Sequence, residues 1–240
     1  LMITGGVLDA KEKGVPGEMK MPEDMIQAIC KKAHQLGLLT SAHVESTEGV
    51  KAALRNGVDS IEHGAKPDQE MMELFKEKKA FLITTLSPAL PFALFDPSVS
   101  KVDDTQLFNG KMVFDGIVEC SKAALENHIP VGLGNDVGCP WITQYDFYRE
   151  LVYFHKYVGV TNGFAIYTAT LQNAILAGIS DITGSIDAGK QADMIVVKEN
   201  PLDDLNALKN IELVFTKGKM VHPKIKRDKE IEQRLDVFCK

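Results

Sequence analysis

The feature that most constrains the fold of this chain is a regular alternation of short apolar segments with longer amphipathic ones. The short segments have the length of buried strands, and the longer ones place apolar side chains at helical spacing. A recurring order of strand, helix and strand is typical of βα units, whose strands form a parallel sheet. The alternation therefore predicts an α/β fold for residues 1–180.

The expected elements follow from this pattern and from the residues that begin and end helices. We expect strands at residues 1–4, 38–43, 58–64, 80–84 and 129–134. We expect helices at residues 23–36, 46–57, 68–78, 104–127, 144–157 and 161–177. Pro22 suits the first turn of a helix, and Gly37 suits the residue that follows its end.

Residues 87–102 break the pattern because they contain Pro88, Pro91 and Pro97. This stretch predicts an irregular segment that is longer than a usual connection between a strand and a helix. Long loops of this kind often form a lid or the wall of a substrate site.

The pattern changes after residue 180. Strands are expected at residues 192–197 and 211–216, and a tight turn at residues 217–219 leads into a further short strand. The charged residues 224–240 carry Ile231, Leu235 and Phe238 at spaced positions, which predicts a terminal helix that docks on the protein. Residues 181–240 therefore predict a small β region beside the α/β part.

Charge and cysteine content argue against several classes of protein. The chain has 27 Lys and Arg against 33 Asp and Glu, a net charge of −6, and no dense basic stripe, so nucleic acid is not an expected partner. No apolar run approaches the roughly 18 residues that a membrane span needs. Cys30, Cys120, Cys139 and Cys239 are too scattered for a paired metal knuckle and too few for a disulfide scaffold, which favours a reducing, cytoplasmic setting.

Three of the expected strands end in a side chain that can bind a metal: His43, His63 and Asp136. Active sites of parallel α/β folds gather at the carboxyl ends of the strands. Imidazoles and a carboxylate are ligands that zinc accepts. An alternative interpretation stays open, in which each histidine bonds a neighbouring loop and Asp136 caps the turn that its Asn-Asp-x-Gly context indicates.

Four motifs carry a resemblance to a known family. They are TSAHV at residues 40–44, GVDSIEHG at 57–64, GLGNDVG at 132–138 and GSIDAGKQAD at 184–193. In this order they resemble the amidohydrolase superfamily, and within it the branch of imidazolonepropionase-like and Xaa-Pro dipeptidase-like enzymes. The resemblance runs from residue 1 to about residue 204.

The resemblance implies a fold and an activity. The fold would be a (β/α)8 TIM barrel, with strands four to eight in residues 1–180, and a small β-sandwich domain to which residues 181–240 contribute. His43 and His63 would hold one or two divalent metals, zinc being the expected ion, and Asp136 would bind metal and handle the proton of the attacking water. A metal lowers the pKa of bound water to about 7 and polarises a carbonyl, which suits the hydrolysis of a C–N bond in an amide, cyclic amide or dipeptide-like substrate.

Two expected features of the family pattern are missing. The His-x-His pair of the first barrel strand is absent, and the family's carboxylated lysine would stand one residue before Leu1. We therefore expect about 125 further residues of barrel upstream, half of a unit of about 250 residues. Two alternatives stay open: an imidazolonepropionase-like enzyme that opens cyclic amides with a single metal, and a non-catalytic barrel fragment.

Weaker site candidates surround the three main ones: Glu45, Cys139, Trp141, Tyr145 and Arg149. Glu45 could face the site, although a solvated loop carboxylate is the simpler interpretation. Cys139 and Trp141 could shape the pocket, and Tyr145 and Arg149, one helical turn apart, could hold a substrate carboxylate or lie on an exposed helix face. A small-molecule substrate and a homo-oligomeric assembly complete the expectations.

Overall fold

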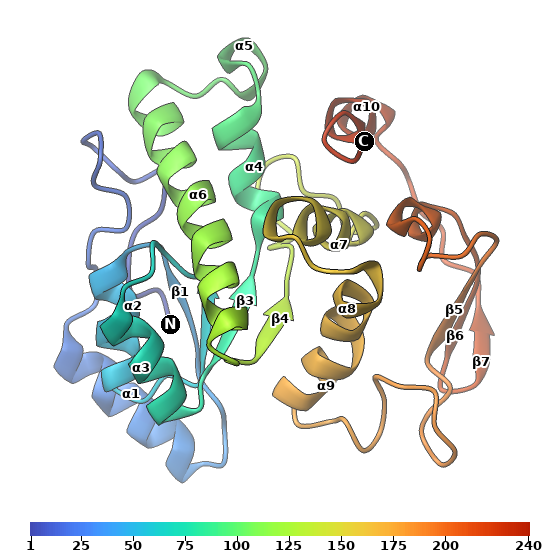
Figure 1. Ribbon diagram of the computed structural model, residues 1–240, viewed down its shortest axis with the longest axis horizontal. Coiled ribbons are helices and arrows are strands. Elements are labelled where there is room, and N and C mark those ends of the chain that lie inside the picture. The colour runs from blue at the N-terminus through green and yellow to red at the C-terminus, as the bar shows by residue number, and fades with distance from the viewer. The chain divides into compact units, whose positions relative to one another are not determined.

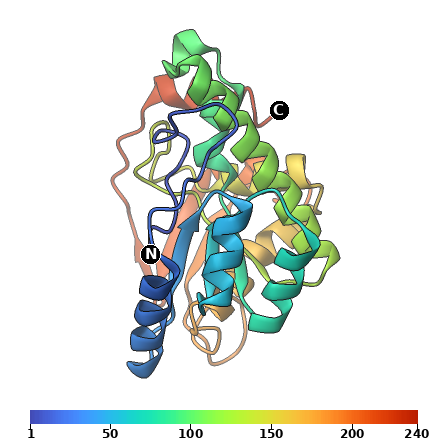
Figure 2. The ribbon, with the colours of Figure 1, turned by 90° about the vertical axis from the view of Figure 1, so that its left-hand side faces the viewer.

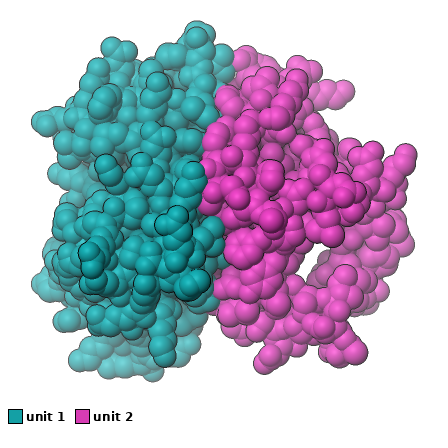
Figure 3. All heavy atoms as spheres, in the orientation of Figure 1, with its two compact units in different colours: residues 1–131 teal, residues 132–240 magenta.

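The structure is a computed structural model that describes residues 1–240. The chain divides into two compact units, Leu1–Val131 and Gly132–Lys240, which Figure 3 draws in different colours. This division falls inside strand β4 (Val131–Leu133), whereas the sequence predicts domains of residues 1–180 and 181–240. That domain assignment stays a prediction.

A four-stranded sheet with the strand order β1-β2-β3-β4 organises the first half of the chain (Figure 1). Its members are β1 (Ser41–Val44), β2 (Ser60–His63), β3 (Phe81–Thr84) and β4. The pairs β1–β2 and β2–β3 are parallel, so the predicted parallel sheet is confirmed. The expected strand at residues 1–4 is reduced to an isolated parallel bridge between Met2 and His43.

Three of the four long helices of the first unit begin where the sequence places a capping side chain, and the first of the four begins after Pro22. The four are α1 (Glu23–Gln35), α2 (Thr47–Arg55), α3 (Gln69–Lys78) and α6 (Asp104–Glu126). The side chains of Ser46, Asp68 and Asp103 accept hydrogen bonds from the first turns of α2, α3 and α6. Each such bond satisfies a backbone N–H that has no partner within its helix. In Figures 1 and 2, α2 and α3 lie side by side along the sheet, as successive crossovers of one hand require.

The prediction of an irregular loop at residues 87–102 is wrong, because this stretch contains two helices, α4 (Leu86–Leu94) and α5 (Pro97–Ser100). Pro88 lies in the first turn of α4, where its missing N–H costs nothing, and Pro97 is the first residue of α5. Only Pro91 lies inside a helix. The packing of α4 along α6, which buries most of α4, outweighs that single lost hydrogen bond.

The second unit contains helices and a small antiparallel sheet. The first helical stretch consists of α7 (Tyr148–Tyr153) and the π-helical turn η1 (Phe154–Val158). The second consists of α8 (Asn162–Tyr167), the π-helical turn η2 (Thr168–Gln172) and α9 (Asn173–Leu176). The predicted helices are thereby confirmed, the first beginning at residue 148 rather than 144. The sheet has the order β5 (Met194–Val197), β6 (Ile211–Thr216) and β7 (Lys219–Val221), with the 3-10 helix η3 (Leu205–Lys209) before β6.

A last helix, α10 (Lys229–Asp236), forms where the sequence predicts a terminal docking helix. Its residue Leu235 is buried, which agrees with the apolar spacing of the tail. None of the helices in the structure combines the length and the apolar character that a membrane crossing requires.

Candidate metal centre

His43 and His63 lie at the carboxyl ends of the neighbouring parallel strands β1 and β2. Ala42 and Val44 are fully buried, and His43 between them points to the opposite face of the sheet. The register pairs Val44 with His63, so strict alternation would place the His63 side chain on the Val44 face. The two imidazole rings nevertheless meet edge to face with their centroids 4.6 Å apart.

A left-handed backbone at His63 accounts for this exception. The φ angle of His63 is 72°, and that of the following Gly64 is 84°. The chain leaves the strand at this point, so the His63 side chain no longer follows the alternation. A residue other than glycine in this conformation costs on the order of 1–3 kcal/mol, and such strain is concentrated at functional sites.

Thr85, the residue after strand β3, fixes the ring of His63. Its hydroxyl Oγ1 lies 2.5 Å from Nδ1 of His63, and both side chains are buried. A hydrogen on Nδ1 that is donated to Thr85 leaves the lone pair of Nε2 for a metal. The sequence does not single out Thr85, although this residue directly follows strand β3.

Glu45 is the third side chain at this place. Its backbone N–H donates to Thr4 Oγ1 at 3.0 Å, and Gly17, with φ of 74°, lies so close to its backbone that a Cβ there would come within 2.6 Å of the Glu45 carbonyl. A Cβ on Gly6 would come within 3.1 Å of the Glu45 carboxylate. Gly6 and Gly17 therefore pack against Glu45, and its Oε2 is buried, so the interpretation of this residue as a solvated loop carboxylate does not fit the structure.

The donor set of these three side chains fits a divalent metal. One ligand atom from each of His43, Glu45 and His63 lies within 4.8 Å of the other two. Two imidazole nitrogens and a carboxylate oxygen suit zinc and several other divalent ions. Cys120 packs near Gly64, and burial raises the pKa of its thiol to about 12.

Asp136 belongs to the second unit, on the connection between β4 and α7. It also has a left-handed backbone, with φ of 51°, and its Oδ2 accepts a hydrogen bond from the Cys139 thiol at 3.0 Å. The connection contains two more residues of positive φ, Gly138 and Trp141. The structure thus joins Cys139 to Asp136 on one connection, and a role of Cys139 and Trp141 in shaping a pocket stays a prediction.

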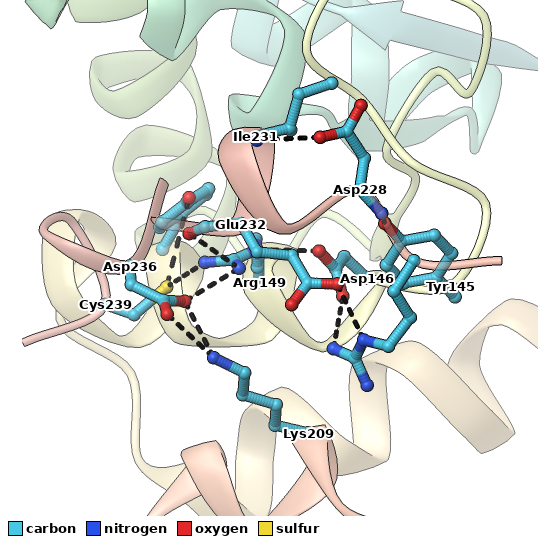
Figure 4. A network of polar contacts seen from close by, with 11 residues as sticks. Tyr145, Asp146, Arg149, Lys209, Asp228, Ile231, Glu232, Asp236 and Cys239 are labelled. Atoms are coloured by element: carbon cyan, nitrogen blue, oxygen red, sulfur yellow. Dashed lines mark hydrogen bonds and ion pairs between the residues drawn. The ribbon is translucent and has the colours of Figure 1, made fainter. Parts of the chain in front are cut away.

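Arg149 and Tyr145 do not form the exposed helix face that the sequence suggests. Arg149 is 2% exposed and donates to Asp146 at 3.2 Å and to Asp236 at 2.8 Å (Figure 4). Burial disfavours its charge, but Tyr148, Cys239 and the hydrogen bond to Asp236 raise the pKa of the guanidinium above its ordinary value. Tyr145 Oη accepts from the backbone N–H of Asp228. These contacts tie α10 to α7 within the second unit.

The sequence profile of the amidohydrolase family matches residues 4–221. The chain belongs to the amidohydrolase family. This confirms the resemblance that the four sequence motifs carry, and members of this family generally use divalent metals.

Individual amidohydrolases and related structures agree with this membership. The chain is 39% identical to a candidate prolidase from Bifidobacterium longum, covering 98% of this chain and 58% of that one with a TM-score of 0.92. It is 30% identical to a Xaa-Pro dipeptidase with bound methionine in its active site, over 92% of this chain and 53% of that one, with a TM-score of 0.80. Ochratoxinase from Aspergillus niger is 27% identical over 225 residues, which are 92% of this chain and 45% of that protein.

The amidohydrolase chain described here thus spans about half the length of the relatives that it matches. The similarity identifies its fold as the TIM-barrel type of metal-dependent hydrolases, and β1 to β4 form a parallel sheet of that type.

Proposed function

We propose that the protein hydrolyses a C–N bond in a small amide, cyclic amide or dipeptide-like substrate and needs a divalent metal to do so. The convergence of His43, Glu45 and His63 on one point at the carboxyl ends of parallel strands carries the proposal. Active sites of barrel enzymes gather at these strand ends. Membership of the amidohydrolase family supports the reaction class.

His43, His63 and Glu45 would hold the metal, for which we propose zinc. A bound divalent cation supplies Lewis acidity, which polarises a carbonyl group and makes water more acidic. Thr85 keeps Nε2 of His63 available by accepting the hydrogen on Nδ1. Gly6 beside the carboxylate, and Gly17 and Thr4 beside the backbone, hold Glu45 in place.

Asp136 would take part in the same reaction as the residue that handles protons and as a further ligand. A carboxylate can accept a proton from the attacking water and pass it to the leaving nitrogen. Its place after a strand of the parallel sheet and the GLGNDVG motif around it support this role.

The fold proposals follow the same resemblance. We propose that the four-stranded sheet is part of a closed (β/α)8 barrel and that the sheet β5-β6-β7 contributes to a small β-sandwich domain. The barrel would include residues 1–180 of this chain, and the β-sandwich domain would include residues 181–240.

The experiment uses the intact purified protein and four substrates: an Xaa-Pro dipeptide, another dipeptide, an N-acyl amino acid and a cyclic amide. Hydrolysis of at least one of them should disappear after dialysis against a chelator and return when zinc is added back. A dipeptidase-like enzyme should prefer the first three substrates, and a ring-opening enzyme the last. Hydrolysis that persists after complete metal removal, or no hydrolysis of an amide bond by the metal-loaded protein, contradicts the proposal.

A further inference from the structure

The connection between β4 and α7, residues 134–147, carries Asp136 in a left-handed backbone conformation. Asp136 has φ of 51° and Trp141 has φ of 72°. Residues other than glycine persist in such conformations only where surrounding contacts impose them. A positioning element for this connection should therefore exist in the structure.

Helix α10 and the residues just before it supply these contacts. The guanidinium of Arg234 lies over the ring of Trp141, 5.9 Å from its centroid. The backbone N–H of Asp228 donates to Tyr145 Oη at 2.6 Å, and the guanidinium of Arg227 lies 5.1 Å from the centre of the same ring. Residues 227–234 thus contact the connection at Trp141 and at Tyr145.

A buried ion-pair network anchors this tail to α7. Arg149 donates to Asp236 of α10 and to Asp146 at the end of the connection (Figure 4). Arg227 Nη2 lies 3.6 Å from Asp146. Lys209 donates to Asp236 from a third element. Arg149 and Asp146 are at least 96% buried, so water screens their interaction little.

We propose that α10, through Arg234, positions the connection that carries Asp136 and thereby sets the rate of the chemical step. The proposal rests on the proposed function, which assigns proton handling to Asp136. Arg234, Arg227 and Tyr145 are positioning residues, because they act on the reaction through the backbone of this connection. The cost of their loss should appear in kcat, since a displaced proton-transfer group affects the transition state more than substrate binding.

The test compares Arg234→Ala, Arg234→Lys and Glu230→Gln in the intact protein. Arg234 also pairs with Glu230 at 2.8 Å, so Glu230→Gln removes this exposed ion pair and keeps the cation over the ring. Arg234 is partly exposed, which lets its alanine variant fold. Trp141 is the single tryptophan of these 240 residues, and its emission is isolated by subtracting the spectrum of a Trp141→Phe variant.

In Arg234→Ala, kcat should fall roughly tenfold with KM nearly unchanged, because small misplacements of reacting groups are costly. The Trp141 emission should move to longer wavelength as the ring becomes hydrated. Arg234→Lys should restore most of both values, and Glu230→Gln should match the unaltered protein.

An active protein whose Arg234→Ala variant keeps its kcat, or keeps the Trp141 emission, overturns the positioning role. A loss of kcat in Glu230→Gln equal to that in Arg234→Ala also overturns it. Absence of hydrolysis by the unaltered protein contradicts the proposed function instead, and the Trp141 emission then still decides whether α10 holds the connection.

Discussion

At the scale of single residues, a substitution of Thr85 tests whether His63 is a metal ligand. Replacing Thr85 by valine keeps the size of the side chain and removes the oxygen that lies 2.5 Å from Nδ1 of His63. Metal affinity should fall about 10–100-fold, as it does when the partner of a ligating histidine is lost. Chelator competition measures this affinity, and Thr85→Ser should restore it. Equal affinities of the valine variant and the unaltered protein would argue against His63 as a ligand.

Asp136 tests the proton-handling role. Asp136→Asn keeps the shape and the left-handed backbone of the residue, since asparagine tolerates φ near 51°. Turnover should fall by about 10²–10⁴-fold, the usual contribution of general acid–base catalysis, while the fold and much of the metal content remain. Initial rates and metal content measured on one preparation decide the outcome, and retained activity sinks the assignment.

The sequence predicts His43 and His63 because a strand end followed by a polar side chain is a local signal. Glu45 is different, because its surroundings come from residues 5–20, which approach it through Gly17 and Gly6. No local pattern reveals that approach. The strained backbone of His63 is equally invisible, since alternation alone would turn the side chain to the other face of the sheet.

At the scale of elements, the predicted helices of the first unit are confirmed where a cap marks their start, and α4 is missed because prolines suggest a loop. Tertiary packing stabilises the helix α4 in spite of its prolines. The sequence says nothing of how α4 packs along α6, so its burial could not be weighed against the prolines.

Asn109 of α6 fastens residues 5–20 within the first unit. This fully buried side chain accepts from Gly14 N–H and donates to the Glu12 carbonyl, both at 2.8 Å. In Asn109→Ala the loop should open more often, since the Glu12 carbonyl and the Gly14 N–H lose the side chain that holds them to α6, and trypsin cleavage at Lys11 and Lys13 should become roughly tenfold faster.

Asp115→Ala, an exposed position of the same helix, is the control and should cleave at the rate of the unaltered protein. Equal cleavage rates in all three proteins would show that Asn109 does not fasten the loop.

At the scale of the whole molecule, Asp59 couples stability to pH. Burial raises the pKa of its carboxyl, but hydrogen bonds from His34 and from Thr40 lower it more, so the pKa lies below its ordinary value. A carboxyl whose pKa is lowered on folding stabilises the protein above its unfolded pKa, about 3.9, and loses this contribution as the pH falls through the folded pKa.

Asp59→Asn should therefore lower the free energy of unfolding by about 1 kcal/mol at pH 7 and by much less below pH 3. Thermal unfolding midpoints across this range measure the difference. Asp115→Asn, at an exposed carboxyl, should show little change at either pH. A deficit of Asp59→Asn that is the same at both pH values would exclude the titration of this carboxyl as its cause.

The most direct test of the proposed metal centre is the metal content of the intact protein and of its histidine variants, measured by inductively coupled plasma mass spectrometry after gel filtration. His43→Ala and His63→Ala should each lose about one equivalent of divalent metal, because each removes a ligand from the centre formed with Glu45. His222→Ala, at an exposed histidine outside this centre, should keep the metal content of the unaltered protein. Full metal content in both His43→Ala and His63→Ala would contradict the metal centre on which the proposed function depends.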